Sequence, residues 1–129
     1  MDTTYARWIG RILSAIPTLF LVFDGAIKLV HPAAVTEASE RMGFPDHLAG
    51  PLGVILLACL ALYLVPRTAV LGATLLTAYL GGAVATHARI DDPLFTHTLF
   101  PIYIAILVWG GLLLRDGRVR AAIGPVTGR

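Results

Sequence analysis

The residues of this sequence most able to do chemistry are ionisable side chains that interrupt an apolar stretch. Asp24 and Lys28 are four residues apart, so on a helix they share one face in the acid-first order that favours an ion pair. His31 follows three residues later and continues that face. Charged residues within a membrane cost about 2.5–3.5 kcal/mol on insertion scales and are functional candidates. The alternative is a structural ion pair whose lysine reaches the membrane surface.

A second set of candidate residues lies near the end of a later apolar stretch. Tyr79 precedes His87 by about two helical turns, and the small Ala83 lies between them. A tyrosine and a histidine beside apolar walls can hydrogen-bond the carbonyl oxygen of a quinone or a lipid. Arg89 follows closely, and the alternative is that His87 and Arg89 only anchor the helix end among lipid head groups.

We therefore predict one polar cluster that binds a ligand. Its members are Asp24, Lys28, His31, Tyr79, His87 and Arg89. The catalytic residues, if the protein is an enzyme, remain unassigned because no motif sets the geometry of these side chains. The sequence does not identify the ligand, for which a quinone or a lipid is the candidate.

Haem and metal ions are less favoured ligands, and no metal site is predicted. The histidines at positions 31, 47, 87 and 97 match no compact ligand motif. Cys59 is the single cysteine, which excludes an internal disulfide and a CxxC redox or zinc pair.

The composition indicates a membrane protein. The 129 residues are 57% hydrophobic and only 14% charged, whereas soluble domains are about 45–50% apolar and about 25% charged. Such apolar content excludes a disordered chain. The net charge of +2 comes without a basic stripe on a polar face, so no nucleic-acid partner is expected.

Four stretches of the chain are long enough to span a bilayer, which takes about 20 helical residues. Three are uncharged, at 48–66, 68–86 and 98–114. The apolar stretch at 12–23 reaches spanning length only if its helix continues through Asp24 and Lys28 to about Val30. We predict an all-α integral membrane four-helix bundle, a single domain over 1–129 with spans at about 8–30, 49–66, 68–88 and 98–115.

The connections between these spans differ in length. Pro66 and Arg67 form a very short turn, which makes the second and third helices an antiparallel hairpin. Pro32 can open a short helix over Ala33–Met42, which Gly43 would end. We interpret it as a short interfacial helix in the first outer loop.

The distribution of basic residues predicts the orientation. Seven lie on the side that carries the termini and the Pro66–Arg67 turn, namely Arg7, Arg11, Arg67, Arg115, Arg118, Arg120 and Arg129, against three on the other side. Both termini are therefore expected to be cytoplasmic, in a bacterial cytoplasmic (inner) membrane. All four histidines and six of the eight acids gather at the outer end.

Small residues repeat along the third span. Thr74, Ala78, Gly82 and Thr86 form one row, and Thr77, Gly81 and Ala85 form another. Because small rows let helix backbones approach closely, we predict that this helix packs tightly in the bundle rather than lining a ligand channel.

The whole chain resembles the DoxX-like family of small four-helix bacterial membrane proteins. The resemblance is carried by FDGAIKL at 23–29, PRTAVLG at 66–72, YLGGAVATH at 79–87 with Arg89, LFP at 99–101, WGGL at 109–112 and Arg115–Asp116. It implies a link to membrane quinol oxidase or thiosulfate–quinone oxidoreductase systems. One departure is Leu56, which stands where the family resemblance leads us to expect a glutamate.

Three functions follow from these observations as hypotheses. The first is a non-catalytic subunit or ligand-binding partner of a quinone-linked redox system, with oxidoreductase subunits, the lipid bilayer and a second copy of the chain as partners. The second is a small membrane enzyme that performs acid–base chemistry on an apolar substrate, with Asp24 as base. The third is an assembly or structural membrane protein.

Overall fold

A computed structural model describes residues 4–123, a range in which helices are joined by short turns and no strand is present. The long helices are α1 (Thr4–Val30), α3 (Ala49–Leu64), α4 (Ala69–Arg89) and α5 (Phe100–Arg115). The shorter helices are α2 (Ala33–Met42) and α6 (Gly117–Ile123), and the connecting turns are η1 (Asp46–Leu48), η2 (Pro66–Thr68) and the π-helical η3 (Leu94–Thr98). Arg129, which entered the charge count above, lies outside the described residues.

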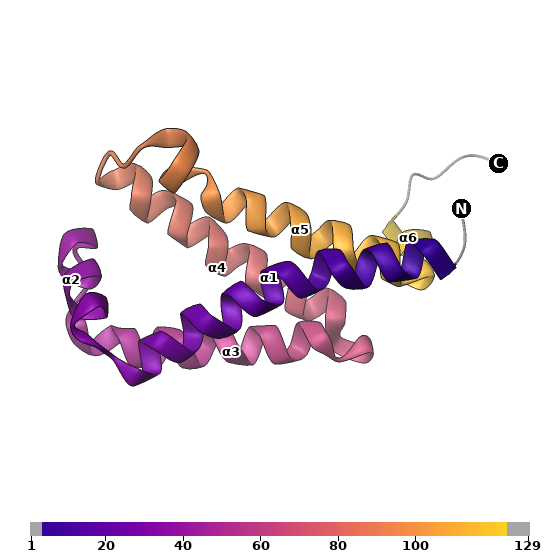
Figure 1. Cartoon of the computed structure of the whole chain (residues 1–129), viewed down its shortest axis with the longest axis horizontal. Coiled ribbons are helices and arrows are strands. Elements are labelled where there is room, and N and C mark those ends of the chain that lie inside the picture. The colour runs from indigo at the N-terminus through magenta and orange to yellow at the C-terminus, as the bar shows by residue number, and fades with distance from the viewer. Residues whose placement is uncertain (1–3, 124–129) are drawn as a thin grey trace.

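The four long helices form a ring in the order α1, α3, α4, α5, in which each helix packs against its two neighbours. Helices α1 and α4 therefore lie diagonally opposite each other. The start of α1 and the end of α5 meet beside α6 at one end of the molecule, and α2 lies at the other end (Figure 1). We call these the terminal end and the α2 end.

The chain contains four helical stretches that are long and apolar enough to cross a membrane. They run over Thr4–Val30, Asp46–Leu64, Pro66–Arg89 and Leu94–Arg115. Large apolar side chains such as Ile12, Leu19 and Ile106 are exposed, as lipid-facing side chains are. The predicted all-α membrane bundle is confirmed.

The connection between α1 and α3 contains the predicted short helix. Helix α2 follows Pro32 and ends at Gly43, whose φ of 82° is the left-handed conformation that favours glycine. At the other end of the connection, His31 also has a positive φ, of 61°. Because α1 ends at Val30, His31 does not continue the helix face predicted for it.

Glycines allow the closest helix contacts at the terminal end. A Cβ atom at Gly10 would overlap the backbone of α5, and one at Gly111 would overlap Ser14 of α1. A Cβ atom at Gly72 of α4 would likewise overlap the backbone of α3 at Tyr63. The α1–α5 and α3–α4 pairs are therefore held at backbone contact near this end.

A buried polar network joins three helices at the same end. The Tyr63 side chain is fully buried, and its hydroxyl donates to the Val108 carbonyl oxygen at 2.7 Å. The hydroxyl of Ser14 donates in turn to the Tyr63 hydroxyl at 2.8 Å. The Arg115 guanidinium lies over the Tyr63 ring and donates to the Tyr63 carbonyl oxygen at 2.9 Å. This network ties α1, α3 and α5 together.

The small rows of α4 do not pack as predicted. No atom lies within 4 Å of the Cβ position at Gly81 or Gly82, and both residues are exposed. The face that α4 buries is instead Ala69, Gly72, Ala73, Leu76 and Leu80. The prediction of tight packing was wrong at these glycines, because α4 packs mainly against α3 and α5 and not against helix α1, its diagonal neighbour.

Candidate functional site

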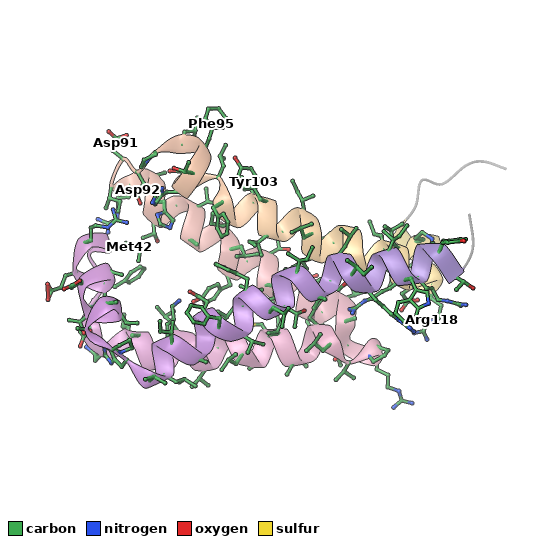
Figure 2. All side chains as sticks on the ribbon, in the orientation of Figure 1. Met42, Asp91, Asp92, Phe95, Tyr103 and Arg118 are labelled. Carbon is green, nitrogen blue, oxygen red and sulfur yellow. The ribbon has the colours of Figure 1, made fainter. Side chains whose placement is uncertain are left out.

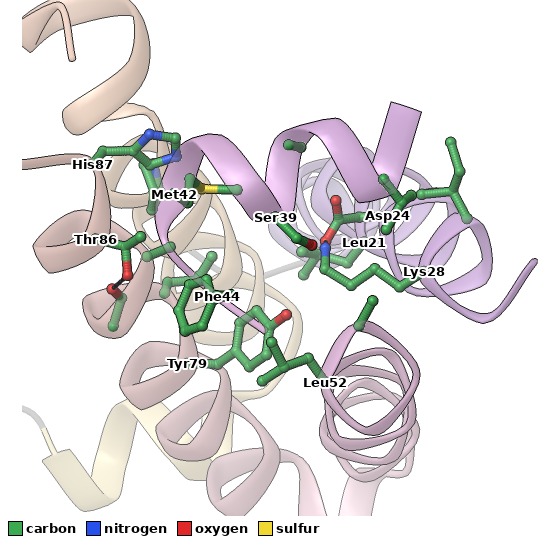
Figure 3. A pocket seen from close by; sticks show the side chains of 18 of the residues that line it. Leu21, Asp24, Lys28, Ser39, Met42, Phe44, Leu52, Tyr79, Thr86 and His87 are labelled. Carbon is green, nitrogen blue, oxygen red and sulfur yellow. Dashed lines mark hydrogen bonds and ion pairs between the residues drawn. The ribbon is translucent and has the colours of Figure 1, made fainter. Parts of the chain in front are cut away.

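A cavity of about 680 Å³ opens at the α2 end, where the α1–α3 pair and the α4–α5 pair diverge (Figure 1). All four long helices contribute to its walls, and one face of α2 covers it. Most of the lining is apolar, as at Leu21, Phe44 and Leu52 (Figure 3). Part of the first small row of α4, at Ala78, Gly82 and Thr86, lines this space, because short side chains leave room beside the helix.

The Asp24–Lys28 ion pair lies on the α1 wall of the cavity. The Lys28 ammonium donates to Asp24 Oδ2 at 2.5 Å, one helical turn away, as the spacing predicts. The Asp24 side chain is 32% exposed and the Lys28 side chain is 23% exposed. Both line the cavity, so the pair presents a neutral but strongly polar surface to any molecule inside.

Tyr79 approaches the same region from α4. Figure 3 shows its hydroxyl directed toward the Asp24–Lys28 pair across the cavity. Within residues 4–123 this hydroxyl makes no hydrogen bond to protein. An uncommitted hydroxyl beside an apolar wall can orient a polar ligand group.

His87 supplies a second polar point, on the α4 wall nearer to α2. Its Nδ1 atom lies 2.5 Å from Oδ2 of Asp92 in the α4–α5 connection. The same carboxylate accepts two hydrogen bonds from Arg41 of α2, at 2.7 Å and 3.3 Å. Only 6% of the Asp92 side chain is exposed. Asp92 therefore joins the cavity wall to the helix that covers it (Figure 2).

The partners of Asp92 also determine its charge. Hydrogen bonds from Arg41 and from His87 hold the pKa of the Asp92 carboxyl at about 2, below the usual 3.8. The same contact raises the pKa of Arg41. The carboxylate is therefore ionised throughout the physiological pH range and can only accept hydrogen bonds.

The two remaining predicted residues, His31 and Arg89, do not line the cavity. They lie beside the two ends of α2 instead. His31 Nε2 lies 2.7 Å from Asp46 Oδ1 of η1 and 3.4 Å from the Thr36 hydroxyl of α2, and Arg89 donates to the Met42 carbonyl oxygen at the end of α2. The structure thus gathers four of the six predicted residues around one cavity and places two beside its cover.

Sequence reasoning missed Arg41 and Asp92, which are 51 residues apart. The excess of acids and histidines at one end of the bundle was the available signal, but it does not show which charges pair.

The structure also explains why position 56 holds a leucine where the family resemblance leads us to expect a glutamate. The Leu56 side chain is fully buried in the apolar core. The α3 residue that faces the Lys28 side chain is Gly53.

The chemistry of the cavity suits an organic molecule. In the described part of the chain, no group of three histidine, cysteine or acidic side chains is placed to hold a metal ion. The polar groups around the space are the Asp24–Lys28 ion pair, the imidazole of His87 and the hydroxyls of Tyr79, Ser39 and Thr86, with aliphatic and aromatic surface between them. Such a lining is typical of sites for largely apolar ligands with a small polar head.

A sequence model described as the DoxX-like family matches residues 12–111 of the chain. The match covers the segments from the first long helix to the last, including all the cavity walls. No curated protein and no solved structure matches the chain.

Proposed function

The chain belongs to the DoxX-like family and is a small integral membrane protein, and we propose that it is a non-catalytic subunit of a membrane redox system that binds a quinone-type molecule in the α2-end cavity. The observation that carries the proposal is the combination of a mostly apolar cavity with an uncommitted Tyr79 hydroxyl facing the Lys28 ammonium.

The size of the cavity supports a ring-shaped head group with the first part of an apolar tail. Its volume of about 680 Å³ falls within the roughly 300–1,000 Å³ of small-molecule sites. Its walls lie within helices that are long and apolar enough to cross a membrane, so a lipid-soluble molecule would reach it from the bilayer.

The polar groups support a neutral head with carbonyl or hydroxyl oxygens. Lys28 and Tyr79 are both donors, and an oxygen of the ligand placed between them would accept from each. Because Asp24 already neutralises Lys28, an anionic head would meet repulsion from Asp24 as well as attraction to Lys28. A quinone is uncharged, so the Asp24–Lys28 pair neither attracts nor repels it as an ion. Its carbonyl oxygen can accept a hydrogen bond here and is not buried without a partner.

The same ion pair disfavours the enzyme hypothesis. As a general base, Asp24 would have to give up its ion pair on taking a proton, because only its ionised form pairs with the Lys28 ammonium at 2.5 Å. Electron transfer would then depend on a partner oxidoreductase subunit.

We further propose a bacterial cytoplasmic membrane location with both termini cytoplasmic, which places the cavity near the outer surface. The exposed second small row of α4 favours contact with a second copy of the chain.

The proposal is tested by titrating the purified protein, in nanodiscs without quinone, with decylubiquinone as the probe. Losing one neutral hydrogen bond costs about 0.5–1.5 kcal/mol, so we expect Tyr79→Phe to bind about 2–12-fold more weakly. The double variant Asp24→Asn/Lys28→Met, which leaves no stranded charge, should also bind more weakly.

Tyr103→Phe is the matched control. It removes a hydroxyl that donates to the Phe95 carbonyl oxygen outside the cavity, and its affinity for the probe should equal that of the wild type. If the wild type does not bind the probe, or if the cavity variants bind as well as this control, the proposed function is wrong.

A further inference from the structure

We infer that Asp92 is a positioning residue of the ligand site, which makes His87 a hydrogen-bond acceptor toward the cavity and so favours the hydroxyl form of the ligand, a quinol, over the carbonyl form. This inference rests on the proposed function and deepens it. It assigns a redox-state preference to the site through a residue that does not itself line the cavity.

The first step concerns the proton on His87. The Asp92 carboxylate can only accept, so the 2.5 Å contact requires that Nδ1 of His87 carries the hydrogen. In the neutral imidazole, Nε2 is then the atom with the free lone pair. Within the described residues no protein group donates to Nε2, and Figure 3 shows the ring directed toward Met42, which also lines the cavity.

The second step concerns the ligand. A quinol hydroxyl placed at Nε2 can donate a hydrogen bond to it, whereas a quinone carbonyl there would bring two acceptors together. At the other polar point, Lys28 and Tyr79 can donate to either a hydroxyl or a carbonyl oxygen, and the Ser39 hydroxyl can donate or accept. The Asp24 carboxylate there is already paired with Lys28 and makes no contact with Asp92. The part of the redox preference that Asp92 controls therefore lies at His87.

The third step concerns what holds Asp92. Arg41 of α2 binds mainly Oδ1, at 2.7 Å, and leaves Oδ2 for His87. The backbone N–H of Asp92 donates to the His87 carbonyl oxygen at 3.1 Å, and Thr98 donates to the Asp92 carbonyl oxygen at 3.2 Å. Asp92 is thus held at its carboxylate by α2 and at its backbone by α4 and η3, with one carboxylate oxygen aimed at His87.

This arrangement makes Asp92→Asn an informative variant. The amide oxygen would stay on Arg41, because Arg41 can only donate. The amide nitrogen would then face His87 and donate to Nδ1, which moves the imidazole hydrogen to Nε2. His87 would become a donor toward the cavity and would favour the carbonyl form. A purely structural role for Asp92 would weaken binding of both forms alike.

The experiment compares the affinities of decylubiquinol and decylubiquinone under anaerobic conditions at about pH 8, where free imidazoles are neutral. We expect the wild type to bind the quinol about tenfold more tightly, the difference made by about one hydrogen bond. For Asp92→Asn we expect this ratio to fall at least tenfold. Asp91→Asn is the matched control, since it removes the same charge one residue away, at a φ of 58° that asparagine tolerates, and its ratio should stay that of the wild type.

An equal ratio in Asp92→Asn and Asp91→Asn would overturn the inference while leaving quinone binding intact. If Asp92→Asn does not fold, the variant His87→Phe tests the inference instead. A ring without nitrogen should bring the ratio of the two affinities close to one. A ratio unchanged from the wild type would overturn the inference. If the wild type binds neither form, the proposed function fails and this inference with it. The results therefore separate the two proposals.

Discussion

Removing the hydroxyl of Tyr63 should destabilise the bundle at its terminal end. In Tyr63→Phe the aromatic ring stays in place, and so does the Arg115 guanidinium over it. The Val108 carbonyl oxygen loses its donor, and the Ser14 hydroxyl, 3% exposed, loses its acceptor. Both groups are far from water, so neither can recover its lost hydrogen bond there.

The size of the effect follows from these two hydrogen bonds. Hydrogen bonds between membrane helices average about 0.6 kcal/mol and reach about 1.7 kcal/mol. Two such bonds give a loss of about 1–3 kcal/mol in the free energy of unfolding. Ser14→Ala should cost about half as much, since it removes only one of the two bonds. The double variant should lose less than the sum, because Ser14 and Tyr63 share a hydrogen bond.

The buried Cys59 provides the assay. It is the single cysteine of the chain and is 8% exposed, so a thiol-reactive dye will label it only as the bundle unfolds on heating. We expect the transition of Tyr63→Phe several degrees below that of the wild type. Tyr103→Phe, whose hydroxyl bond is at an exposed position, should shift it much less. Equal shifts for the two tyrosine variants would refute the network as a source of stability.

Three further predictions follow from the contacts. Gly111→Ala should destabilise the α1–α5 contact by about 1–3 kcal/mol in the same dye assay, because its Cβ would overlap Ser14, whereas Gly110→Ala, with no atom within 4 Å, should be neutral or slightly stabilising. Arg41→Met should speed dissociation of decylubiquinol in stopped-flow measurements, because α2 loses its bond to Asp92, and a wild-type rate would show that this bond does not hold the cover. Since the pKa of Asp92 falls from 3.8 to about 2 on folding, its stabilising contribution is complete above about pH 4 and is lost toward pH 2; circular dichroism melts should show a steeper acid loss for the wild type than for Asp92→Asn.

The sequence predicted the helices well where local chemistry determines them. The first span had to include Asp24 and Lys28 to reach membrane length, and α1 does run through both to Val30. The short helix was bounded by Pro32 and Gly43, whose backbone preferences are local, and α2 has those bounds. Length, apolar content and helix-ending residues are properties of a segment, and so they can be read without knowing its neighbours.

The contacts between helices could not be predicted in the same way. Gly72 and Gly82 look alike in the sequence of α4, yet a Cβ at the first would overlap Tyr63 and at the second would meet open space. The bond between Arg41 and Asp92 joins residues 51 positions apart, and the alternating charges around them allow other pairings. Arg115 was interpreted as a topology signal, whereas it also binds the Tyr63 carbonyl oxygen. Each of these outcomes depends on which helix lies opposite.

The unequal ends of the bundle explain why a cavity can persist between the helices. At the terminal end, Gly10, Gly72 and Gly111 bring two helix pairs to backbone contact, and the Tyr63 network locks them. Because these contacts hold the helices together at the terminal end, the helices can diverge at the α2 end while the bundle stays folded. There the Asp24–Lys28 pair supplies polar surface that would be costly against lipid, and α2 covers it through Arg41. The stability of the terminal end and the open space of the α2 end are therefore separable, so substitutions at the glycines should change unfolding, and substitutions at Asp92 or Tyr79 should change ligand binding.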